Sequence, residues 1–243
     1  KVNVGASGFT VTEERKKNIN FTDTYITTKQ VIIVKGDSNT QKASIGEKFY
    51  DNFIKDSRYM YIVKGLGNTL LITLLAVTIG IILGFIIAII RTGYDRNGEL
   101  PILNAICKVY LTVMRGTPVM IQLLIIYYVI LASATNKIMV AAIAFGLNSA
   151  AYVAEIVRSG IMSVDIGQFE AGRSLGLNYQ QTMQSIILPQ AIKNILPALL
   201  NEVISLLKET SISGYIGLMD LTKGGDIIRS NTYEAFLPLI AVA

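Results

Sequence analysis

The groups best placed to do chemistry in this chain are charged residues inside apolar segments. Glu202 and Glu209 lie seven residues apart, so on a helix they share one face. Ionisable groups in a membrane-spanning helix are costly and usually functional. Two acids lining a cavity would suit a cationic amino acid, with Thr210 and Ser211 as hydrogen-bond partners. The alternative is that Lys208 and Glu209 lie at the water boundary and Glu202 makes a structural hydrogen bond.

A second polar group interrupts another apolar segment. The residues Arg115-Gly116-Thr117-Pro118 predict a helix break that exposes backbone groups to a substrate, with Arg115 and Thr117 beside its path. The alternative is a proline kink with an arginine that extends toward water. Glu155 and Arg158 are three apart and predict an ion pair on one helix face. Asn148 and Ser149 are expected to bind neighbouring helices.

Several chemistries are excluded by residue types. The chain has no histidine, so acid–base catalysis or zinc binding through histidine is excluded, and the single cysteine, Cys107, excludes an intrachain disulfide. No Gly-x-x-x-x-Gly-Lys-Ser/Thr loop is present, so the chain does not bind ATP in that manner. We therefore expect no catalytic residue, no cofactor and no metal site. The net charge of +5 forms no run, so no nucleic-acid surface is expected.

The composition predicts an all-α membrane protein, because 51% of residues are hydrophobic, 16% are charged, and the mean hydropathy is +0.49. The first expected span is uncharged from Gly65 to Ile90, and Gly80 and Gly84 predict close helix packing within it. We expect five spans, with a polar glycine-rich loop between the last two. The other four expected spans are 102–132 with its break, 138–157, 191–207, and one that starts near Ala235 and is cut off.

The basic residues suggest an orientation. Arg91 and Arg96 fall in an expected polar loop from Arg91 to Pro101, and Arg158 and Arg173 flank a bent element that follows the third span. The positive-inside rule makes the side of both loops cytoplasmic. The N-terminus is then expected outside.

The bent element runs from Glu170 to Pro189 and reads as two short helical pieces joined at a glycine. Gly176 suits the left-handed position after a helix, and Asn178 can cap the next helix. Pro189 either stops that helix or starts another in its first turn. Such a bend leaves backbone groups unpaired and cannot lie in lipid, so we expect it at the water boundary.

These residues resemble the EAA motif of ABC-importer permeases: Glu170-Ala171-Gly172, Gly176, Ile186, Leu188 and Pro189. Gly172 departs from the family pattern, which usually has a second alanine, and should loosen the first short helix slightly. Three further segments look like those of permeases of the polar amino acid subfamily: Arg115-Gly116-Thr117-Pro118, Glu155 and Lys208-Glu209-Thr210-Ser211. The resemblance runs from about Ile45 to the end.

The resemblance implies a type I importer transmembrane domain, with the bent element as the coupling helix that docks on a cytoplasmic ATPase dimer. It also implies a second permease subunit, identical or not, a substrate-binding receptor outside, and a bacterial cell membrane location. The chain is then not itself an enzyme. The alternatives are an ion-coupled amino-acid transporter with Glu202 and Glu209 as proton or cation sites, and a membrane scaffold.

The first residues look different from the rest. Residues 1–35 carry a predicted strand, 31–34, and a helix start at Thr12, and they resemble part of a type II amino-acid substrate-binding protein. That resemblance assigns the ligand carboxylate to Arg15, assisted by Ser7 and Thr10. The stub is too short for a core of its own, which favours a non-binding remnant. Residues 36–57 are expected to be a linker and an interfacial helix, 58–243 a permease domain, and both chain ends are expected to be truncated.

Overall fold

The computed structural model describes residues 44–243. The predicted α/β stub, with its strand at 31–34 and the ligand residues Ser7, Thr10 and Arg15, lies outside the described residues, as does most of the linker. Within residues 44–243 every regular element is a helix, which confirms the all-α prediction for this part of the chain.

The helices follow one another with short connections. In chain order they are α2 (Ile45–Phe49), η1 (Tyr50–Ile54), η2 (Lys55–Ser57), α3 (Tyr59–Asn97), α4 (Pro101–Gly116), α5 (Val119–Ile125), η3 (Ile126–Ile130), α6 (Lys137–Met162), α7 (Ile166–Ser174), α8 (Tyr179–Thr182), η4 (Met183–Ile187), α9 (Leu188–Glu209), η5 (Thr210–Ile216), α10 (Leu221–Thr232) and α11 (Phe236–Val242).

The centre of the bundle is the pair α3 and α6, which share the most extensive helix contact. Gly80 and Gly84 of α3 face α6, and a Cβ placed on Gly84 would lie 2.6 Å from the Cβ of Val153. The small residues therefore allow the two backbones to approach, which confirms the predicted close packing. Fully buried Ile72 and Phe145 belong to the apolar cluster between the helices.

The structure supports fewer membrane spans than the sequence predicts. Among the described residues, two helices are long and apolar enough to cross a membrane, 59–95 and 137–162. A third span results if the pair α4 and α5–η3, bent by 110°, is counted as one. The helix α9 has 22 residues but carries Lys193, Glu202, Lys208 and Glu209, and α11 has only seven residues. The five-span prediction is therefore not established by length and composition.

Two predicted loops are largely helical. The expected loop 91–101 is mostly the end of α3, and only 98–100 form the turn. The expected glycine-rich loop after α9 contains η5 and the twelve-residue helix α10. Gly224 and Gly225 sit in α10 because side chains would not fit: a Cβ on Gly224 would lie 2.6 Å from the carbonyl oxygen of Tyr61. Tertiary contact overrides the low helix propensity of glycine.

The expected interfacial helix also differs from the structure. Its first part is helical as predicted, but Phe53 is buried, whereas Phe49 and Ile54 are about half exposed. Buried Asn52 accepts a hydrogen bond of 2.8 Å from Thr232 of α10, and Lys48 pairs with Glu234 at 3.1 Å. One face of this segment therefore packs on the protein instead of facing lipid.

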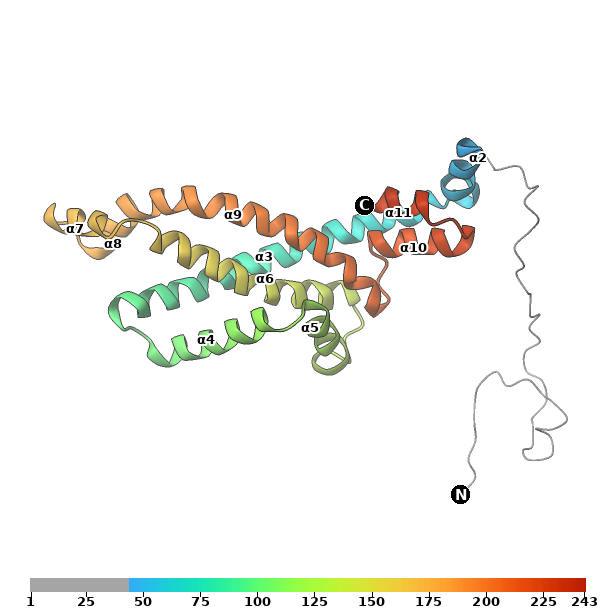
Figure 1. Cartoon of the computed structure of the whole chain (residues 1–243). Coiled ribbons are helices and arrows are strands. Elements are labelled where there is room, and N and C mark those ends of the chain that lie inside the picture. The colour runs from blue at the N-terminus through green and yellow to red at the C-terminus, as the bar shows by residue number, and fades with distance from the viewer. Residues whose placement is uncertain (1–43) are drawn as a thin grey trace, which may run out of the picture. The chain divides into compact units, whose positions relative to one another are not determined.

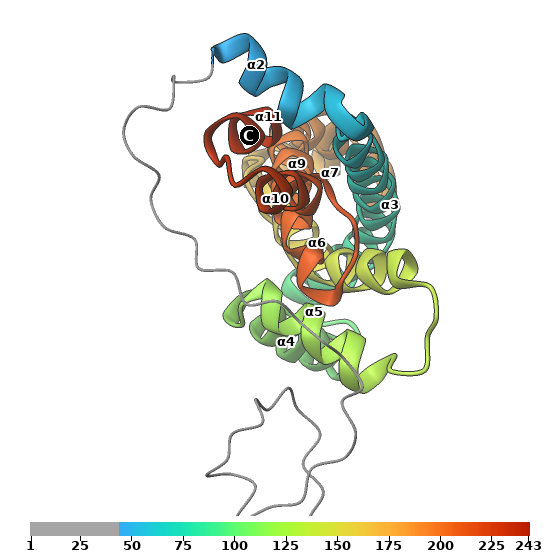
Figure 2. The ribbon, with the colours of Figure 1, turned by 90° about the vertical axis from the view of Figure 1, so that its right-hand side faces the viewer.

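The bundle has two distinct ends. The turn between α3 and α4 lies at the same end as α7 and α8, while α2, α10 and α11 lie at the opposite end (Figure 1). Figure 2 looks onto that opposite end, with α10 and α11 in front of the bundle. An ion pair of 3.3 Å between Arg158 and Asp95 joins α6 to the end of α3. The connection between α3 and α4 and the bent element of α7 and α8 therefore lie on the same side of the bundle, which confirms that prediction.

Candidate functional site

The bent element at the end of the bundle is built by local capping. Asp165 accepts a hydrogen bond of 2.6 Å from the backbone N–H of Gly167 and so begins α7. Gly176 ends it in the left-handed conformation, with φ of 77°. The N–H groups of Leu177 and Gly176 donate to the carbonyls of Gly172 and Arg173, at 3.1 and 2.9 Å. This pattern is a Schellman motif and confirms the bend predicted at Gly176.

The second half of the element leads directly into α9. Asn178 accepts from the N–H of Gln181, and the Gln181 side chain accepts from the N–H of Asn178, both at 2.9 Å. This capping box confirms the predicted cap. The helix then continues without a break through α8, η4 and α9, and Pro189 lies in the first turn of α9. Of the two roles predicted for Pro189, the structure has the second.

The two short helices meet at Gly172. A Cβ on Gly172 would lie 2.6 Å from Cγ2 and 2.7 Å from Oγ1 of Thr182, whose side chain is 1% exposed. Phe169 of α7 and Tyr179 of α8 stack beside this contact, with ring centres 6.3 Å apart. The loosening of α7 by Gly172 stays a prediction. The structure shows that the missing methyl group makes room for Thr182.

The residues of the EAA-like motif divide between surface and interior. Glu170, Ala171, Gly176 and Pro189 are exposed, Gly172 is buried, and Ile186 and Leu188 are partly buried. Apolar side chains also point outward at this tip, with Leu175 76% and Ile166 64% exposed.

The element is firmly joined to the helices on either side of it. Phe169 packs in an apolar cluster with Ile161, Ile187 and Ile195, which come from α6, η4 and α9. Asn194 of α9 donates a hydrogen bond of 2.9 Å to the Oγ of Ser163 at the end of α6. The bent element is therefore packed against both of the long helices that flank it.

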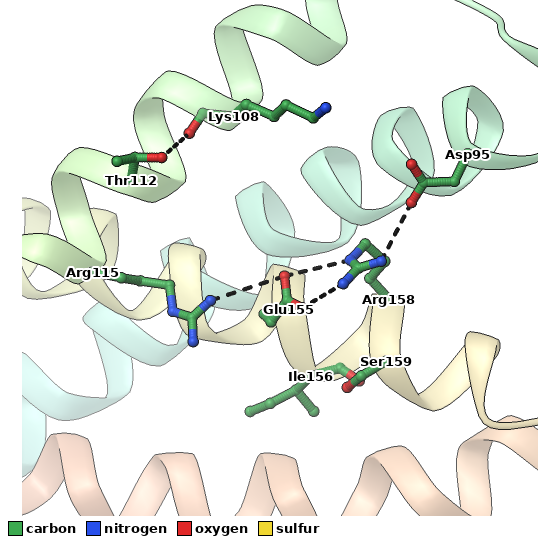
Figure 3. Close-up of polar contacts among 8 residues, drawn as sticks. All are labelled: Asp95, Lys108, Thr112, Arg115, Glu155, Ile156, Arg158 and Ser159. Atoms are coloured by element: carbon green, nitrogen blue, oxygen red, sulfur yellow. Dashed lines mark hydrogen bonds and ion pairs between the residues drawn. The ribbon is translucent and has the colours of Figure 1, made fainter.

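A group of four charges lies near this end (Figure 3). Arg158 binds Glu155 at 2.6 Å, which confirms the predicted pair, and binds Asp95 at 3.3 Å. Glu155 also lies 4.0 Å from Arg115 at the end of α4. The guanidinium of Arg115 is 5.7 Å from the ring centre of Tyr152. These charges connect three helices, α3, α4 and α6.

The helix break after Arg115 is stabilised by amide side chains. The Nε2 of Gln122 donates to the carbonyl of Met114 at 2.8 Å and to that of Thr117 at 3.1 Å. Asn148 of α6 donates to the Oε1 of Gln122 at 2.9 Å, so it binds a neighbouring helix as predicted. The carbonyls released by the break are therefore occupied by the protein's own amides. The sequence predicted the break and Asn148, but it did not single out Gln122.

Glu202 and Glu209 occupy different surroundings. The Oγ of Ser149 donates a hydrogen bond of 2.8 Å to Glu202, beside a cavity of about 10 Å³ that Val77, Val153 and Leu199 also line. Glu209 is partly buried at the end of α9. Thr210 is buried and donates to the Leu207 carbonyl at 2.7 Å, and exposed Ser211 donates to that of Lys208 at 2.6 Å. Both hydroxyl groups therefore donate to backbone carbonyls at the end of α9 and not to either acid.

The six predicted path residues form two groups. Arg115 contacts Glu155 and Tyr152, and exposed Thr117 donates to the Val113 carbonyl, all at the break. The other four lie along α9 and at the start of η5.

A buried acid that the sequence analysis missed organises the opposite end. Asp220 is 0% exposed and accepts hydrogen bonds from the Oγ of Ser213 and the N–H groups of Gly214 and Lys223, at 2.8, 2.6 and 2.6 Å. It caps α10 and holds η5 against it. The sequence contains a signal for this cap, because an Asp directly before the first residue of a helix commonly accepts a hydrogen bond from the N–H of the third helical residue.

Comparisons with known proteins agree with this geometry. The model of the family described as binding-protein-dependent transport system inner membrane component matches residues 80–243. A Rickettsia bellii protein, provisionally named as a glutamine transport system permease, is 40% identical over 198 residues, 80% of this chain and 88% of that one. An arginine transport system permease of Bacillus subtilis is 40% identical over 183 residues, 74% of this chain and 81% of that one.

A solved structure matches as well. The crystal structure of an amino acid ABC transporter with histidines aligns with a TM-score of 0.70 at 43% identity, and covers 78% of this chain and 88% of that chain. The helices and the exposed bent element define a subunit of a membrane transport system. The chain belongs to the family of binding-protein-dependent transport system inner membrane components, and it is an ABC transporter permease.

Proposed function

We propose that this permease imports polar amino acids, driven by a separate cytoplasmic ATPase that docks on the bent element. The carrying observation is that the exposed tip of α7 and α8 is rigidly built and packed against both α6 and α9. The similar permeases for glutamine and arginine, and the solved structure of an amino acid ABC transporter, support the substrate class. The working unit would contain two permease subunits and an external substrate-binding receptor.

In the proposed arrangement the α7–α8 end is cytoplasmic and the N-terminus is outside. Residues 58–243 form the permease domain, with α9 and α11 as its fourth and fifth spans. Partly buried Glu202 supports this reading, because its carboxylate accepts a hydrogen bond from Ser149 of α6. The ligand role of Ser7, Thr10 and Arg15 rests on sequence resemblance.

The docking proposal predicts which surface the ATPase needs. Glu170→Ala combined with Gly176→Val should abolish co-purification with the cognate ATPase, because it removes an exposed charge and strains the left-handed bend. The matched control is Glu234→Ala with Gly217→Val, which changes the same residue types, including a left-handed glycine, at the opposite end. Loss of the complex in the control alone, or in neither variant, would contradict the proposal.

The proposed substrate path follows the acids of α9, with Thr210 and Ser211 at its end and Arg115 and Thr117 at the helix break. Glu202→Gln should weaken uptake of arginine or lysine about tenfold or more, while glutamine uptake changes less than twofold. A hydrogen bond to a charged group contributes about 1.5–3 kcal/mol, and 1.4 kcal/mol is tenfold in affinity. In the Glu202→Gln variant the side-chain amide oxygen can still accept the hydrogen bond from Ser149, so the fold is expected to survive.

The measurement is ATP-driven uptake into proteoliposomes that contain the permease and its ATPase. Exposed Asn201, which precedes Glu202 on α9, provides the control Asn201→Ala. Equal losses for cationic and neutral substrates would remove Glu202 from the path. Uptake driven by an ion gradient without ATP or ATPase would instead support an ion-coupled transporter.

A further inference from the structure

Three features of the structure place Glu155 between the docking element and the broken helix. It lies two turns before the end of α6, and only 163–165 separate that end from α7. Its carboxylate contacts Arg158 on its own helix and Arg115 at the end of α4. Arg115 is the last charged residue before the break, where the chain turns by 110° into α5.

The junction between α6 and α7 is stiff enough to carry a movement. The backbone N–H of Ser163 donates to the Ser159 carbonyl at 2.9 Å and so extends α6 by one residue. Val164 is 7% exposed and belongs to the same apolar cluster as Ile161 and Phe169. A displacement of α7 therefore moves the last turns of α6, which carry Arg158 and Glu155.

The ion contacts of this group differ in strength. The contact between Arg158 and Glu155 is 2.6 Å and lies within one helix, so it survives any movement of α6 as a body. The contact of Arg158 with Asp95 is 3.3 Å. Arg115 and Glu155 are 4.0 Å apart, beyond hydrogen-bond distance, and the Arg115 side chain is 46% exposed. Exposed ion pairs contribute little, so this contact is the first to open.

The break itself is held by amide side chains. Buried Gln122 donates to the carbonyls of Met114 and Thr117 at 2.8 and 3.1 Å. Buried Asn148 of α6 donates to the Gln122 side chain at 2.9 Å and to the Met114 carbonyl at 3.4 Å. The end of α4 is therefore attached to α5 and the middle of α6 through the Met114 carbonyl, and to the last part of α6 through the contact between Arg115 and Glu155. We expect a movement of the last turns of α6 relative to its middle to open the contact between Arg115 and Glu155, the longest of these attachments.

We infer that Glu155 is a positioning residue for transport. Its contact with Arg115, called the latch below, holds the end of α4 and opens when the docked ATPase moves α7. The inference rests on the proposed docking function. It adds a connection from the docking element to the helix break, where Arg115 and Thr117 border the proposed substrate path. In this structure the latch is closed, because Arg115 and Glu155 lie 4.0 Å apart.

The test uses the complete transporter, with permease, cognate ATPase and receptor, in liposomes. Glu155→Gln keeps the size of the side chain and removes its charge. We expect the number of substrate molecules transported per ATP hydrolysed to fall at least fivefold, while receptor-independent ATP hydrolysis rises. Glu155→Asp, which keeps the charge, should recover at least half of the ratio. Asp226→Asn is the matched control, since Asp226 forms an i,i+3 pair of 2.8 Å with Arg229 outside this group.

A double-mutant comparison separates a latch from a substrate contact. If Arg115 acts through Glu155, Arg115→Gln has the same effect as Glu155→Gln and adds nothing to it. If Arg115 binds substrate instead, its variant raises the substrate KM and its effect adds to that of Glu155→Gln, which overturns the latch. A transport-to-ATP ratio within twofold of the wild type in Glu155→Gln also overturns it.

Salt gives a readout that a merely structural role would not change. Raising the salt from about 0.05 to 0.5 M shortens the Debye length from more than 10 Å to a few Å and weakens exposed charge contacts. The ratio should fall in the wild type and stay constant in Glu155→Gln. Should Glu155→Gln fail to assemble, Glu155→Asp and the salt series decide the question. Failure of the wild-type chain to bind its ATPase would contradict the docking function and not the latch alone.

Discussion

Replacing Asp220 by alanine is expected to destabilise the permease more than any other single change considered. The carboxylate is fully buried, and its removal leaves the Ser213 hydroxyl and the N–H groups of Gly214 and Lys223 without their acceptor. Losing a helix cap costs about 1 kcal/mol, and each buried donor left unpaired costs about 1–3 kcal/mol. The expected loss of unfolding free energy is about 3–5 kcal/mol.

The effect should extend beyond α10, because Asp220 lies where several elements meet. Asn68 of α3 donates a hydrogen bond of 2.7 Å to the Met219 carbonyl, and the Leu221 N–H donates to Thr69 at 3.1 Å. A loosened 210–220 segment therefore also releases the start of α3. Asp220→Asn retains one acceptor oxygen and should lose roughly half as much free energy.

Unfolding can be followed through the chain's single thiol. Cys107 is buried, with 8% exposure, so a thiol-reactive dye labels it only as the bundle opens. The control is Asp226→Ala on the same helix, whose side chain is 41% exposed and whose loss should change stability by less than about 0.5 kcal/mol. Equal midpoints for Asp220→Ala and the control would show that the buried carboxylate is not a major support.

Gly172→Ala is expected to reduce transport strongly although it restores the residue type usual for the motif. The new methyl group would lie 2.6 Å from Cγ2 of Thr182, which is too close, so α7 must shift away from α8. Overpacking costs about 1–3 kcal/mol, which lowers the population of the docking geometry about fivefold to more than a hundredfold. The higher helix propensity of alanine does not favour the docking geometry, because α7 is helical both before and after it shifts away from α8.

The reciprocal change should restore the geometry. Thr182→Ala removes both atoms that clash, Cγ2 and Oγ1, so transport by the double variant Gly172→Ala/Thr182→Ala should return to within about threefold of the wild type. Gly67→Ala is the matched control, since no atom lies within 4 Å of a Cβ at that position in α3. ATP-driven uptake and co-purification with the ATPase are the measurements. A double variant no better than Gly172→Ala would exclude Thr182 as the cause.

Much of the docking element follows from local sequence. The bend at Gly176, the capping box at Asn178 and the Glu155–Arg158 pair each depend on residues within five positions of one another, so the helix geometry determines them. The closeness of α3 and α6 also follows from a local pattern, because Gly80 and Gly84 share one face of a helix. The long uncharged run in α3 likewise predicts a membrane-spanning helix from local sequence alone.

Other features were decided by contacts between residues far apart in the chain. A run rich in polar residues and glycine predicts a loop at 210–234, but η5 and α10 form because Gly224 packs on Tyr61 and Asp220 caps the helix. The partners of Arg115, Asp95 and Glu202 come from other helices, and no spacing in the sequence predicts them. Local sequence thus determined the individual helices and the bend, since backbone hydrogen bonds join near neighbours. Only the packing of the helices decided which polar groups meet, because side-chain contacts depend on distance in space.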